Sequence, residues 1–375
     1  TLTRRGSVML PSNVQYVWQH PTQPFLYATT SDAASGNTPV PGVMHRLCAI
    51  RMAADGSLSL HGEPAALPSR PIHHCVNPAG THALCAFNNP SHITVHAINA
   101  DGTVGALVQQ KAKVDVGIYA HQVVVAPSNN IVIFPARGND AKGGKAEDPG
   151  AIKVYRFDNG QISDAQNIRC GNNGFDYRPR HVDFHPSRPW MYVNIESQNE
   201  LHMHTLLPTA GGDVVSEKPL FIETTLAAVH DPKRHQTNSA IHVHPNGRHL
   251  YIANRADGLT EFNGEKVFVG GENSIAVFAI DQTTGKPMRI QSVDPLTHHV
   301  RTLGIHPGGK LLICASIRDM KVRSGDGVRV APAGLTVFRI QDDGKLELVR
   351  KYDQQLPQQL SGRLQWCAGF AALRS

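Results

Sequence analysis

Apolar and polar residues alternate in a way that predicts a β-hairpin at residues 180–196. The stretch reads R-H-V-D-F-H-P-S-R-P-W-M-Y-V-N-I-E, with a short alternating run before the turn and an aromatic and β-branched run after it. Two such runs around a Pro-containing turn are typical of antiparallel strands. The start of the first strand and the end of the second strand lie at the same end of a hairpin. Arg180 and Glu196 are therefore expected at a common edge, a cation beside a carboxylate.

The same hairpin pattern occurs six times along the chain. A period of roughly 50–60 residues separates the turn prolines, and a recurring period of this kind indicates a repeat architecture. The turn prolines are Pro21, Pro78, Pro127, Pro186, Pro245 and Pro307. Turn chemistry and flanking strand pattern recur together, so the repeat is a structural unit.

Each copy continues with a third strand, a polar turn and a weaker fourth strand. The third strands are expected at residues 92–99, 151–158, 274–281 and 335–341. Four antiparallel strands per repeat are typical of a β-propeller blade. A solenoid is the structural competitor, but its repeats are usually shorter. We predict an all-β fold, a seven-bladed β-propeller of four-stranded antiparallel blades.

The two ends of the chain are expected to share the closing blade of a single propeller domain, residues 1–375. L-Q-W-C-A-G-F at 364–370 has the pattern of an innermost strand, and T-L-T-R-R-G-S-V-M-L at the N-terminus could supply an outer strand. Two middle strands then have no counterpart. We favour the interpretation that roughly 20 residues are missing before Thr1, by analogy with how propellers close. An irregular closing blade is the alternative.

Composition and charge narrow the class of partner. The chain is 41% hydrophobic and 18% charged, with a net charge of +6, and its Lys and Arg residues are dispersed. Without a basic run, a nucleic-acid partner is not expected, whereas an anionic small molecule fits this balance. No segment approaches the roughly 18 apolar residues of a membrane span. No membrane association is therefore expected, and the sequence leaves the oligomeric state unknown.

The cysteines and the N-terminus bear on the compartment. The six cysteines show no CxxC spacing and lie mostly in apolar, strand-like runs, which predicts reduced, buried thiols. The opening T-L-T-R-R-G-S is not followed by the apolar segment of a signal peptide. A cytoplasmic location is expected. Export is not excluded, because a segment already removed would leave no trace.

The propeller geometry collects polar residues on one face. If the first strand of each blade lines a central channel, first-strand starts and second-strand ends share that face, and the His-Pro turns lie on the other. The starts supply His73, His121, Arg180, His181 and Arg301, and the ends supply Asn88, Arg137, Glu196 and Arg255. His20, His185, His244 and His306 are then turn residues. The Gly-rich insertions 137–150, 256–273 and 318–334 are expected to be irregular covers around the same rim.

Arginines and histidines with one carboxylate suit an anionic substrate. Arginine binds carboxylate or phosphate with a bidentate fork, Glu196 could act as a base toward water, and His121 could act as an acid. The competing interpretation is a rim salt bridge between Arg180 and Glu196 with a merely hydrogen-bonded His121. Spacing alone does not separate these two interpretations.

Other chemical motifs are weak or absent. The pairs His242/His244 and His202/His204 each place two imidazoles on one strand face, but without an HExxH motif structural roles are favoured over a metal site. No GxSxG elbow, GxGxxG loop before a helix or GxxxxGK[ST] loop occurs. The commonest serine-hydrolase and nucleotide-binding interpretations are thereby removed.

The chain resembles the seven-bladed propeller lactonase family. The resemblance rests on P-R-H-V-D-F-H-P followed by V-N-I-E, and on N-G-R-H-L-Y-I-A-N-R, and extends repeat by repeat over nearly the whole chain. Members of that family include propeller-type bacterial 6-phosphogluconolactonase and fungal carboxy-muconate lactonizing enzyme. The resemblance implies a site of one His, two Arg and one Glu. The matching positions here are His121, Arg180, Arg255 and Glu196, and His73 and Arg301 match blade-start positions.

Two departures from the family pattern concern the ends and the insertions. The family's N-terminal strand pair is absent here, and the insertions 256–273 and 318–334 look longer than in the phosphogluconolactonase type. Longer insertions could reshape the pocket for a different lactone. The resemblance therefore supports the reaction type more strongly than the substrate.

The predicted function is hydrolysis of a sugar-derived or sugar-acid lactone in carbohydrate metabolism. The substrate would be 6-phosphogluconolactone-like or an aldono- or aldaro-lactone. The catalytic residues would be Glu196, His121, Arg180 and Arg255, with His73, His181 and Arg301 binding substrate. Glu196 would activate water, the arginines would hold the anionic group and stabilise the oxyanion, and His121 would protonate the ring oxygen. No cofactor and no metal ion are expected.

Two other functions remain open at this point. One is a muconate-type lactonizing or isomerising enzyme, because ring closure and ring opening share a site. The other is a non-catalytic propeller that serves as an interaction platform, since a fold does not by itself imply a function.

Overall fold

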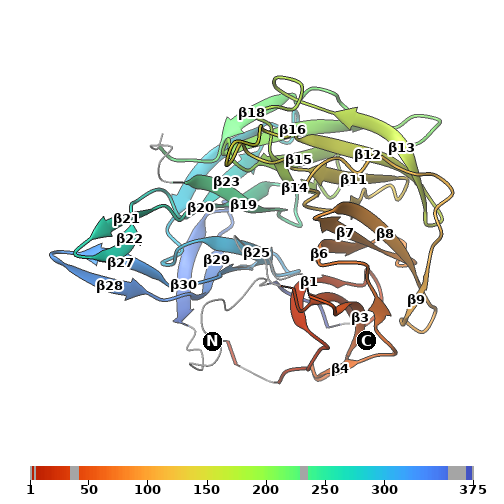
Figure 1. Ribbon diagram of the computed structural model, residues 1–375, viewed down its shortest axis with the longest axis horizontal. Coiled ribbons are helices and arrows are strands. Elements are labelled where there is room, and N and C mark those ends of the chain that lie inside the picture. Colours follow the sequence, from red (N-terminus) through yellow and green to blue (C-terminus); the bar gives the residue numbers. More distant parts are fainter. Residues whose placement is uncertain (1, 4–5, 34–41, 229–234, 354–368, 374–375) are drawn as a thin grey trace. The chain divides into compact units, whose positions relative to one another are not determined.

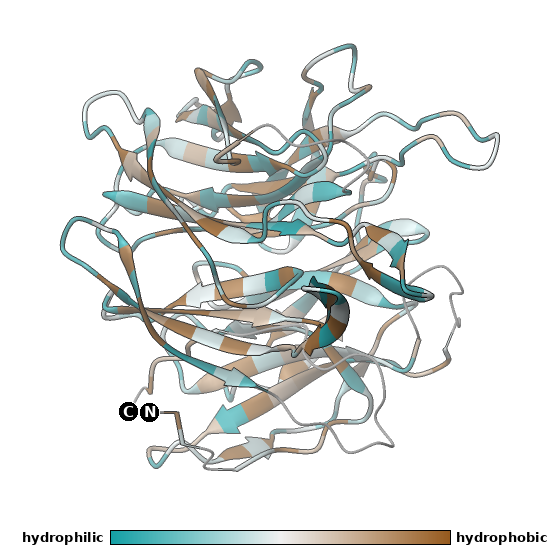
Figure 2. Ribbon diagram, turned by 90° about the vertical axis from the view of Figure 1, so that its left-hand side faces the viewer, coloured by the Kyte–Doolittle hydropathy of each residue, from teal (hydrophilic) through white to brown (hydrophobic). Residues whose placement is uncertain are grey.

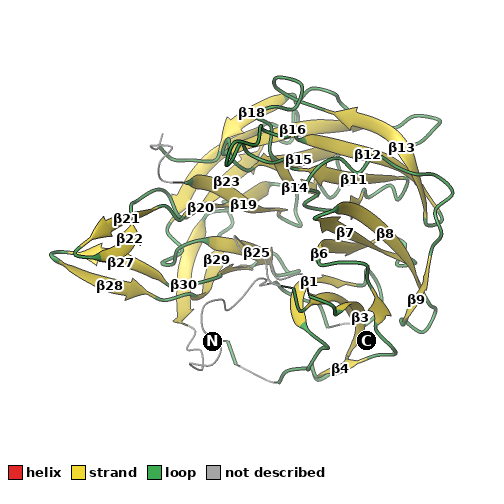
Figure 3. Cartoon of the chain, viewed as in Figure 1, coloured by secondary structure: helices red, strands yellow, loops and turns green. Residues whose placement is uncertain are grey.

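The computed structural model describes residues 2–3, 6–33, 42–228, 235–353 and 369–373. Its described residues contain strands and loops but no helix (Figure 3). None of them therefore belongs to a helix of the length and apolarity that crossing a membrane requires. The expected inner strand at 364–370 lies largely outside the described residues. The chain forms two compact units, one of Thr1–Val182, Leu206–Lys218 and Ala372–Ser375, the other of Asp183–Thr205 and Pro219–Ala371.

The first unit contains three antiparallel sheets whose strands follow one another in chain order (Figure 1). The first sheet consists of β1 (Asn13–Gln19), β2 (Phe25–Ser31), β3 (His45–Met52), β4 (Leu58–Leu60) and β5 (Ala65–Ala66). The second consists of β6 (Pro71–Val76), β7 (His82–Asn88), β8 (Ser91–Ile98) and β9 (Val104–Leu107). The third consists of β10 (Val124–Val125), β11 (Ile131–Ala136), β12 (Ala151–Asp158) and β13 (Gln161–Ile168).

A fourth sheet contains residues of both units. Its strands are β14 (Pro179–Phe184), β15 (Trp190–Ile195), β16 (Glu200–Leu207), β17 (Val214–Val215) and β18 (Phe221–Thr224). The strands β14 and β16 each have residues in both units, whereas β15 and β18 belong to the second unit. This sheet carries the hairpin from which the repeat was first identified.

The second unit adds two further four-stranded sheets. One consists of β19 (Gln236–Val243), β20 (His249–Ala256), β23 (Ser274–Ile280) and β24 (Pro287–Val293). The other consists of β25 (Val300–Ile305), β26 (Leu311–Ser316), β29 (Gly334–Ile340) and β30 (Leu346–Asp353). All six predicted hairpins and the four predicted third strands are confirmed.

Two of the insertions differ from the sequence expectation. Residues 256–273 and 318–334 are not irregular but contain ordered hairpins. The strands are β21 (Leu259–Phe262) with β22 (Glu265–Phe268), and β27 (Met320–Ser324) with β28 (Gly327–Ala331). The hairpins lie side by side (Figure 1), because Arg323 stacks 4.3 Å from the Phe262 ring centroid and Lys321 pairs with Glu265. Gly-rich turns masked the strand pattern of these short segments.

The hydrophobic core lies between consecutive sheets. In the first unit one cluster joins Tyr27 and Leu47 of the first sheet to Phe87 of the second. In the second unit another cluster joins Tyr192 of β15 to Phe278 of β23. The strands carry most of the hydrophobic residues, alternating along each strand with hydrophilic ones (Figure 2). Four-stranded sheets that bury their faces against the next sheet in sequence are the packing expected of propeller blades.

The His-Pro turns tie one blade to the next, as the sequence predicted for these histidines. His185 Nδ1 accepts hydrogen bonds from the Ser187 and Arg188 amides, and its Nε2 donates to the Gly247 carbonyl at 2.9 Å. Gly247 has φ 71°, and a Cβ there would lie 2.3 Å from His185 Nε2. Glycine is required at this position on both grounds. His20 donates to Gly80 and His244 to Gly309 in the same way.

Buried neutral histidine predicts acid sensitivity. His74 is fully buried, donates from Nε2 to the Tyr27 carbonyl at 2.9 Å, and has Nδ1 3.2 Å from the Thr29 hydroxyl. Burial lowers the pKa of His74 to about 4. The unfolded chain, with an ordinary histidine pKa of about 6.5, binds the proton first. The stability that the protein has with a neutral His74 is therefore complete above pH 6.5. As the pH falls from 6.5 toward 4, the free energy of unfolding decreases by about 3 kcal/mol.

We expect the unfolding free energy from urea titrations to fall across that pH range, and to fall less steeply in His74→Gln. Equal slopes for both proteins would contradict the assignment.

Candidate active site

In the second unit a buried ion pair forms the centre of the candidate site. Glu196 directly follows β15, and Arg255 is the penultimate residue of β20. Arg255 Nη2 donates to Glu196 Oε1, and each residue is only 5% exposed. A buried charge needs a partner of opposite sign, and this pair satisfies that requirement for both residues.

Asparagine side chains hold the strand ends that carry this pair. Asn194 Nδ2 donates to Asn238 Oδ1 at 2.8 Å and to the Ser239 carbonyl at 2.7 Å. Asn238 Nδ2 in turn donates to the Ile195 carbonyl at 3.0 Å. The strand β19 is irregular between Asn238 and Ile241. A bulge of this kind re-aims side chains at a functional edge, and here it lies beside Glu196.

Arg255 is held by two further contacts. Its Nε lies 3.4 Å from the Asn238 carbonyl, and its Nη1 lies 3.1 Å from Nε2 of His299. His299 immediately precedes β25. Arginine only donates, so the His299 nitrogen facing it must be the acceptor.

An aspartate lies behind His299. His299 Nδ1 is 3.2 Å from Asp257 Oδ2, although the N–H is not aimed directly at that oxygen. Asp257 also contacts Arg318 Nη2 at 2.7 Å and pairs with His235. Burial alone would raise the pKa of Asp257, but the hydrogen bond from His235 and the interaction with nearby His299 outweigh burial and hold that pKa well below its usual value. Burial lowers the pKa of His299 to about 4, and the bond to Asp257 raises the pKa of His235.

In the first unit three buried histidines come together. The ring centroid of His181 lies 5.6 Å from that of His73 and 5.0 Å from that of His121. Arg180 Nη1 lies 3.3 Å from His181 Nδ1, and the Arg180 side chain is fully buried. The ring centroids of Tyr16 and His73 lie 4.0 Å apart. His73, Arg180 and His181 lie in the first strands of their sheets and His121 lies just before one, as the blade pattern predicted.

The predicted site residues thus divide between the two units. Glu196 and Arg255 are brought together in the second unit, and Arg301 lies half-buried on β25 of that unit. His73, His121, Arg180 and His181 form the group in the first unit. The shared edge of Arg180 and Glu196 stays a prediction. Arg137 instead pairs with Asp140 at 2.9 Å, inside the insertion at 137–150.

Sequence reasoning missed several residues of these clusters. They include Tyr16, Asn238, Asp257 and His299. The blade pattern contained a signal for two of them, because Asp257 follows a second strand and His299 precedes a first strand. His299 lies two residues before Arg301, and the sequence analysis selected only Arg301 at the start of this strand.

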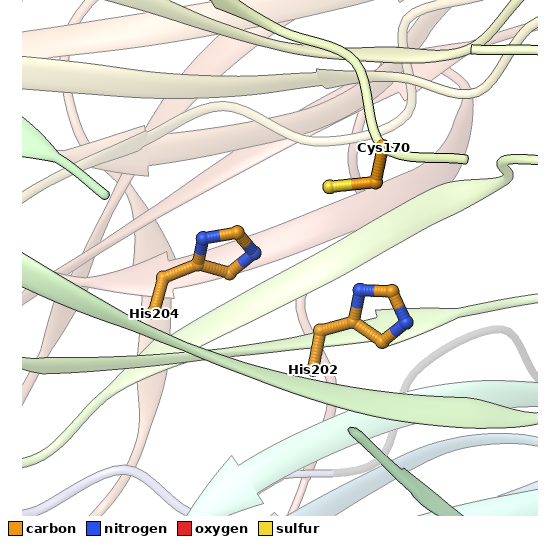
Figure 4. Close-up of side chains that lie close together, drawn as sticks. All are labelled: Cys170, His202 and His204. Carbon is orange, nitrogen blue, oxygen red and sulfur yellow. The ribbon is translucent and has the colours of Figure 1, made fainter. Parts of the chain in front are cut away.

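The histidine pairs that could suggest a metal have other contacts. His244 accepts from the Asn246 amide and donates to Gly309, so both of its ring nitrogens are engaged. His202 and His204 project from one face of β16 with ring centroids 6.5 Å apart (Figure 4). His202 Nε2 lies 2.9 Å from Glu200 Oε2. The contacts of His244 agree with the turn role expected from the sequence. Ligand atoms of Cys170, His202 and His204 lie within 4.8 Å of one another and could hold a metal ion, so a structural role for His202 and His204 stays a prediction.

The chain matches a known family along most of its length. The family model described as "Lactonase, 7-bladed beta-propeller" matches residues 1–324. Together with the six described sheets, this match confirms the predicted fold class, an all-β, seven-bladed β-propeller.

Individual relatives are distant. The 6-phosphogluconolactonase of Bacillus subtilis is 25% identical over 255 residues, 66% of this chain and 63% of that protein's length. The 6-phosphogluconolactonase of Cronobacter sakazakii is 26% identical over 325 residues, 84% of this chain and 80% of that protein.

Two solved structures share the fold. A Lactobacillus plantarum protein has a TM-score of 0.67 and 19% identity, covering 95% of this chain and 89% of its own. The periplasmic gluconolactonase of Pseudomonas aeruginosa has a TM-score of 0.65 and 17% identity, covering 90% of this chain and 85% of its own.

Proposed function

We propose that this chain, which belongs to the seven-bladed β-propeller lactonase family, is a hydrolase that opens a sugar-derived or sugar-acid lactone to the hydroxy acid. The observation that carries the proposal is the buried pair of Glu196 and Arg255 at the ends of two second strands. A carboxylate held beside a guanidinium combines a base with an anion-binding group. Hydrolysis of a lactone needs both.

Glu196 is the proposed general base. It takes a proton from water as the oxygen of that water attacks the lactone carbonyl carbon, and the carbonyl oxygen becomes an oxyanion. Arg255 has five N–H donors, of which three serve Glu196, His299 and Asn238 in the described residues. Two donors then remain for a substrate oxygen. A preorganised cation at a developing oxyanion is among the largest contributions to catalysis.

The cluster of the first unit supplies the remaining proposed roles. When the tetrahedral intermediate collapses, the carbon–oxygen bond of the ring breaks and its oxygen needs a proton, which we assign to His121. Arg180 binds the anionic group of the substrate, for which a planar guanidinium is suited. His73, His181 and Arg301 are proposed substrate contacts. Proton transfer through these side chains needs no metal ion or cofactor.

The proposed substrate is an anionic lactone, either 6-phosphogluconolactone or a related aldono- or aldaro-lactone. Curated relatives named 6-phosphogluconolactonase support the phosphorylated member at 25% to 26% identity. Two insertions of this chain form the hairpins β21–β22 and β27–β28, and Arg318 just before β27 contacts Asp257. This connection supports a substrate preference set by the insertions.

The decisive measurement is acid release from a panel of lactones in a pH-indicator assay. The panel contains 6-phosphogluconolactone, gluconolactone and aldaric lactones, each with and without chelator. We expect fast, chelator-resistant turnover of one anionic member, because arginine and not a metal is proposed to meet the charge. Absence of turnover across the panel, with product formed from a muconate, would replace this proposal by the lactonizing enzyme.

We also propose a cytoplasmic location. Five of the six cysteines lie in the described part of the chain, and none of those five forms a disulfide. Four of them, Cys48, Cys75, Cys85 and Cys314, are buried, as predicted for reduced thiols. Fractionation of cells that express the natural gene would test the location.

A further inference from the structure

A line of contacts in the second unit leads from the insertion hairpins to the candidate base. Asp257 contacts His299, His299 contacts Arg255, and Arg255 pairs with Glu196. Asp257 lies between β20 and the hairpin β21–β22, and Arg318 lies just before β27. Each contact joins residues of the second unit. The roles assigned above use Glu196 and Arg255 but leave Asp257 and His299 without a function.

The chemistry of the contacts fixes the tautomer of His299. Because Arg255 Nη1 can only donate, His299 Nε2 must present its lone pair at 3.1 Å. A neutral imidazole then carries its proton on Nδ1, the nitrogen 3.2 Å from Asp257 Oδ2. Burial, which lowers the pKa of His299 to about 4, favours the neutral ring at neutral pH. The opposite tautomer would bring two N–H groups face to face at Arg255.

Asp257 is itself anchored from two sides. Its Oδ2 accepts from Arg318 at 2.7 Å, and its Oδ1 pairs with His235. Its hydrogen bonds keep the carboxyl ionised, because they hold its pKa well below the usual value against the opposing effect of burial. A fixed carboxylate behind an imidazole sets the orientation and tautomer of the ring, as the aspartate of a serine-protease triad does.

We propose that Asp257 is a positioning residue which, through the Nδ1–H tautomer of His299, aligns the guanidinium of Arg255 with Glu196. The inference deepens the proposed function and rests on it for its effect on catalysis. The contacts themselves can be tested separately. Arg318 makes the positioning of Arg255 depend on the insertion that precedes β27. Specificity can thereby be set by a segment that need not touch the substrate.

The test combines the variant Asp257→Asn with ¹⁵N-resolved NMR of the histidine rings, in which His299 is assigned by comparison with His299→Gln. In the wild-type protein we expect protonated Nδ1 and unprotonated Nε2 at His299. In Asp257→Asn the amide can donate to Nδ1, so we expect the Nε2–H tautomer to become populated. Turnover should fall on the order of 10²- to 10⁴-fold, the scale of a tautomer error in a triad.

Asp257→Glu and Glu265→Gln serve as comparisons. Asp257→Glu keeps the carboxylate and should restore the wild-type tautomer and part of the turnover. Glu265 pairs with Lys321 between the same two hairpins and is not part of the line of contacts from Asp257 to Glu196. Glu265→Gln should leave the tautomer and turnover unchanged, which shows that a lost ion pair between the hairpins is not sufficient.

Two results would overturn the inference. One is a wild-type spectrum with the proton of His299 on Nε2, which decides the matter even if Asp257→Asn does not fold. The other is a folded Asp257→Asn protein with wild-type tautomer or wild-type turnover. If no lactone is turned over by the wild-type protein, the proposed function fails. The tautomer measurements on the wild-type and variant proteins still decide whether Asp257 positions His299.

Discussion

Glu196→Gln is expected to lower kcat for the lactone by about 10³-fold, within the range of 10²- to 10⁴-fold that general-base catalysis contributes. The amide keeps the shape of the side chain but cannot take a proton from water. Because Gln retains an acceptor oxygen for Arg255, the protein should stay folded, with KM changed less than kcat. Steady-state kinetics on the lactone identified in the panel, with circular dichroism as the check of folding, measures both effects.

Glu200→Gln is the matched control for this prediction. Glu200 lies four residues further along, is more exposed, and contacts His202 at 2.9 Å instead of Arg255. The same loss of one negative charge there should leave turnover within about twofold, because exposed ion pairs contribute little. Unchanged turnover in Glu196→Gln would remove Glu196 as the base and restore the salt-bridge interpretation.

Arg255→Met is expected to destabilise the protein by about 3–5 kcal/mol, the cost of removing one partner of a buried ion pair. Methionine fills similar space, but the buried carboxylate of Glu196 would lose the Arg255 guanidinium, and His299 would lose its donor. Turnover should also be lost, because the oxyanion loses its proposed cation. Urea unfolding at pH 7, compared at equal m-values, measures the change in unfolding free energy.

The double variant Glu196→Gln with Arg255→Met separates the stability that comes from the ion pair from the stability that comes from side-chain packing. If the cost comes from the lost pairing of Glu196 with Arg255, neutralising Glu196 should recover about 0.5–3 kcal/mol of the loss, the usual coupling for residues in contact. Strictly additive effects of the two substitutions would show that the ion pair does not carry this stability, and the energetic part of the site description would then be wrong.

The hairpins were predictable because their signals are local. His185 and Pro186 form a turn whose histidine accepts from the amides two and three residues ahead, so sequence neighbours largely specify it. The alternation on either side fixes which side chains are buried, since a strand has a period of two. The same reasoning failed for the hairpin β21–β22. Its strands are four residues long and lie between glycines, too short for a periodic pattern to emerge.

The site residues were predictable as a class but not as partners. Blade geometry placed Glu196 and Arg255 at strand ends on one face, and the family resemblance selected them from the others. Neither source indicated that they form a buried ion pair, or that His299 holds the arginine from its other side. Asp257 and Arg318 were read only as parts of insertions.

The sequence by itself therefore determined the repeat, the turns and the strand order. These follow from turn residues and alternating polarity, which act over a few neighbouring positions. Only the tertiary structure decided which charges meet. Glu196 and Arg255 are separated by 59 positions, and Asp257 and Arg318 by 61. The first of these pairs forms because packing of successive sheets buries both side chains together, and a buried charge is stable only beside its counter-charge.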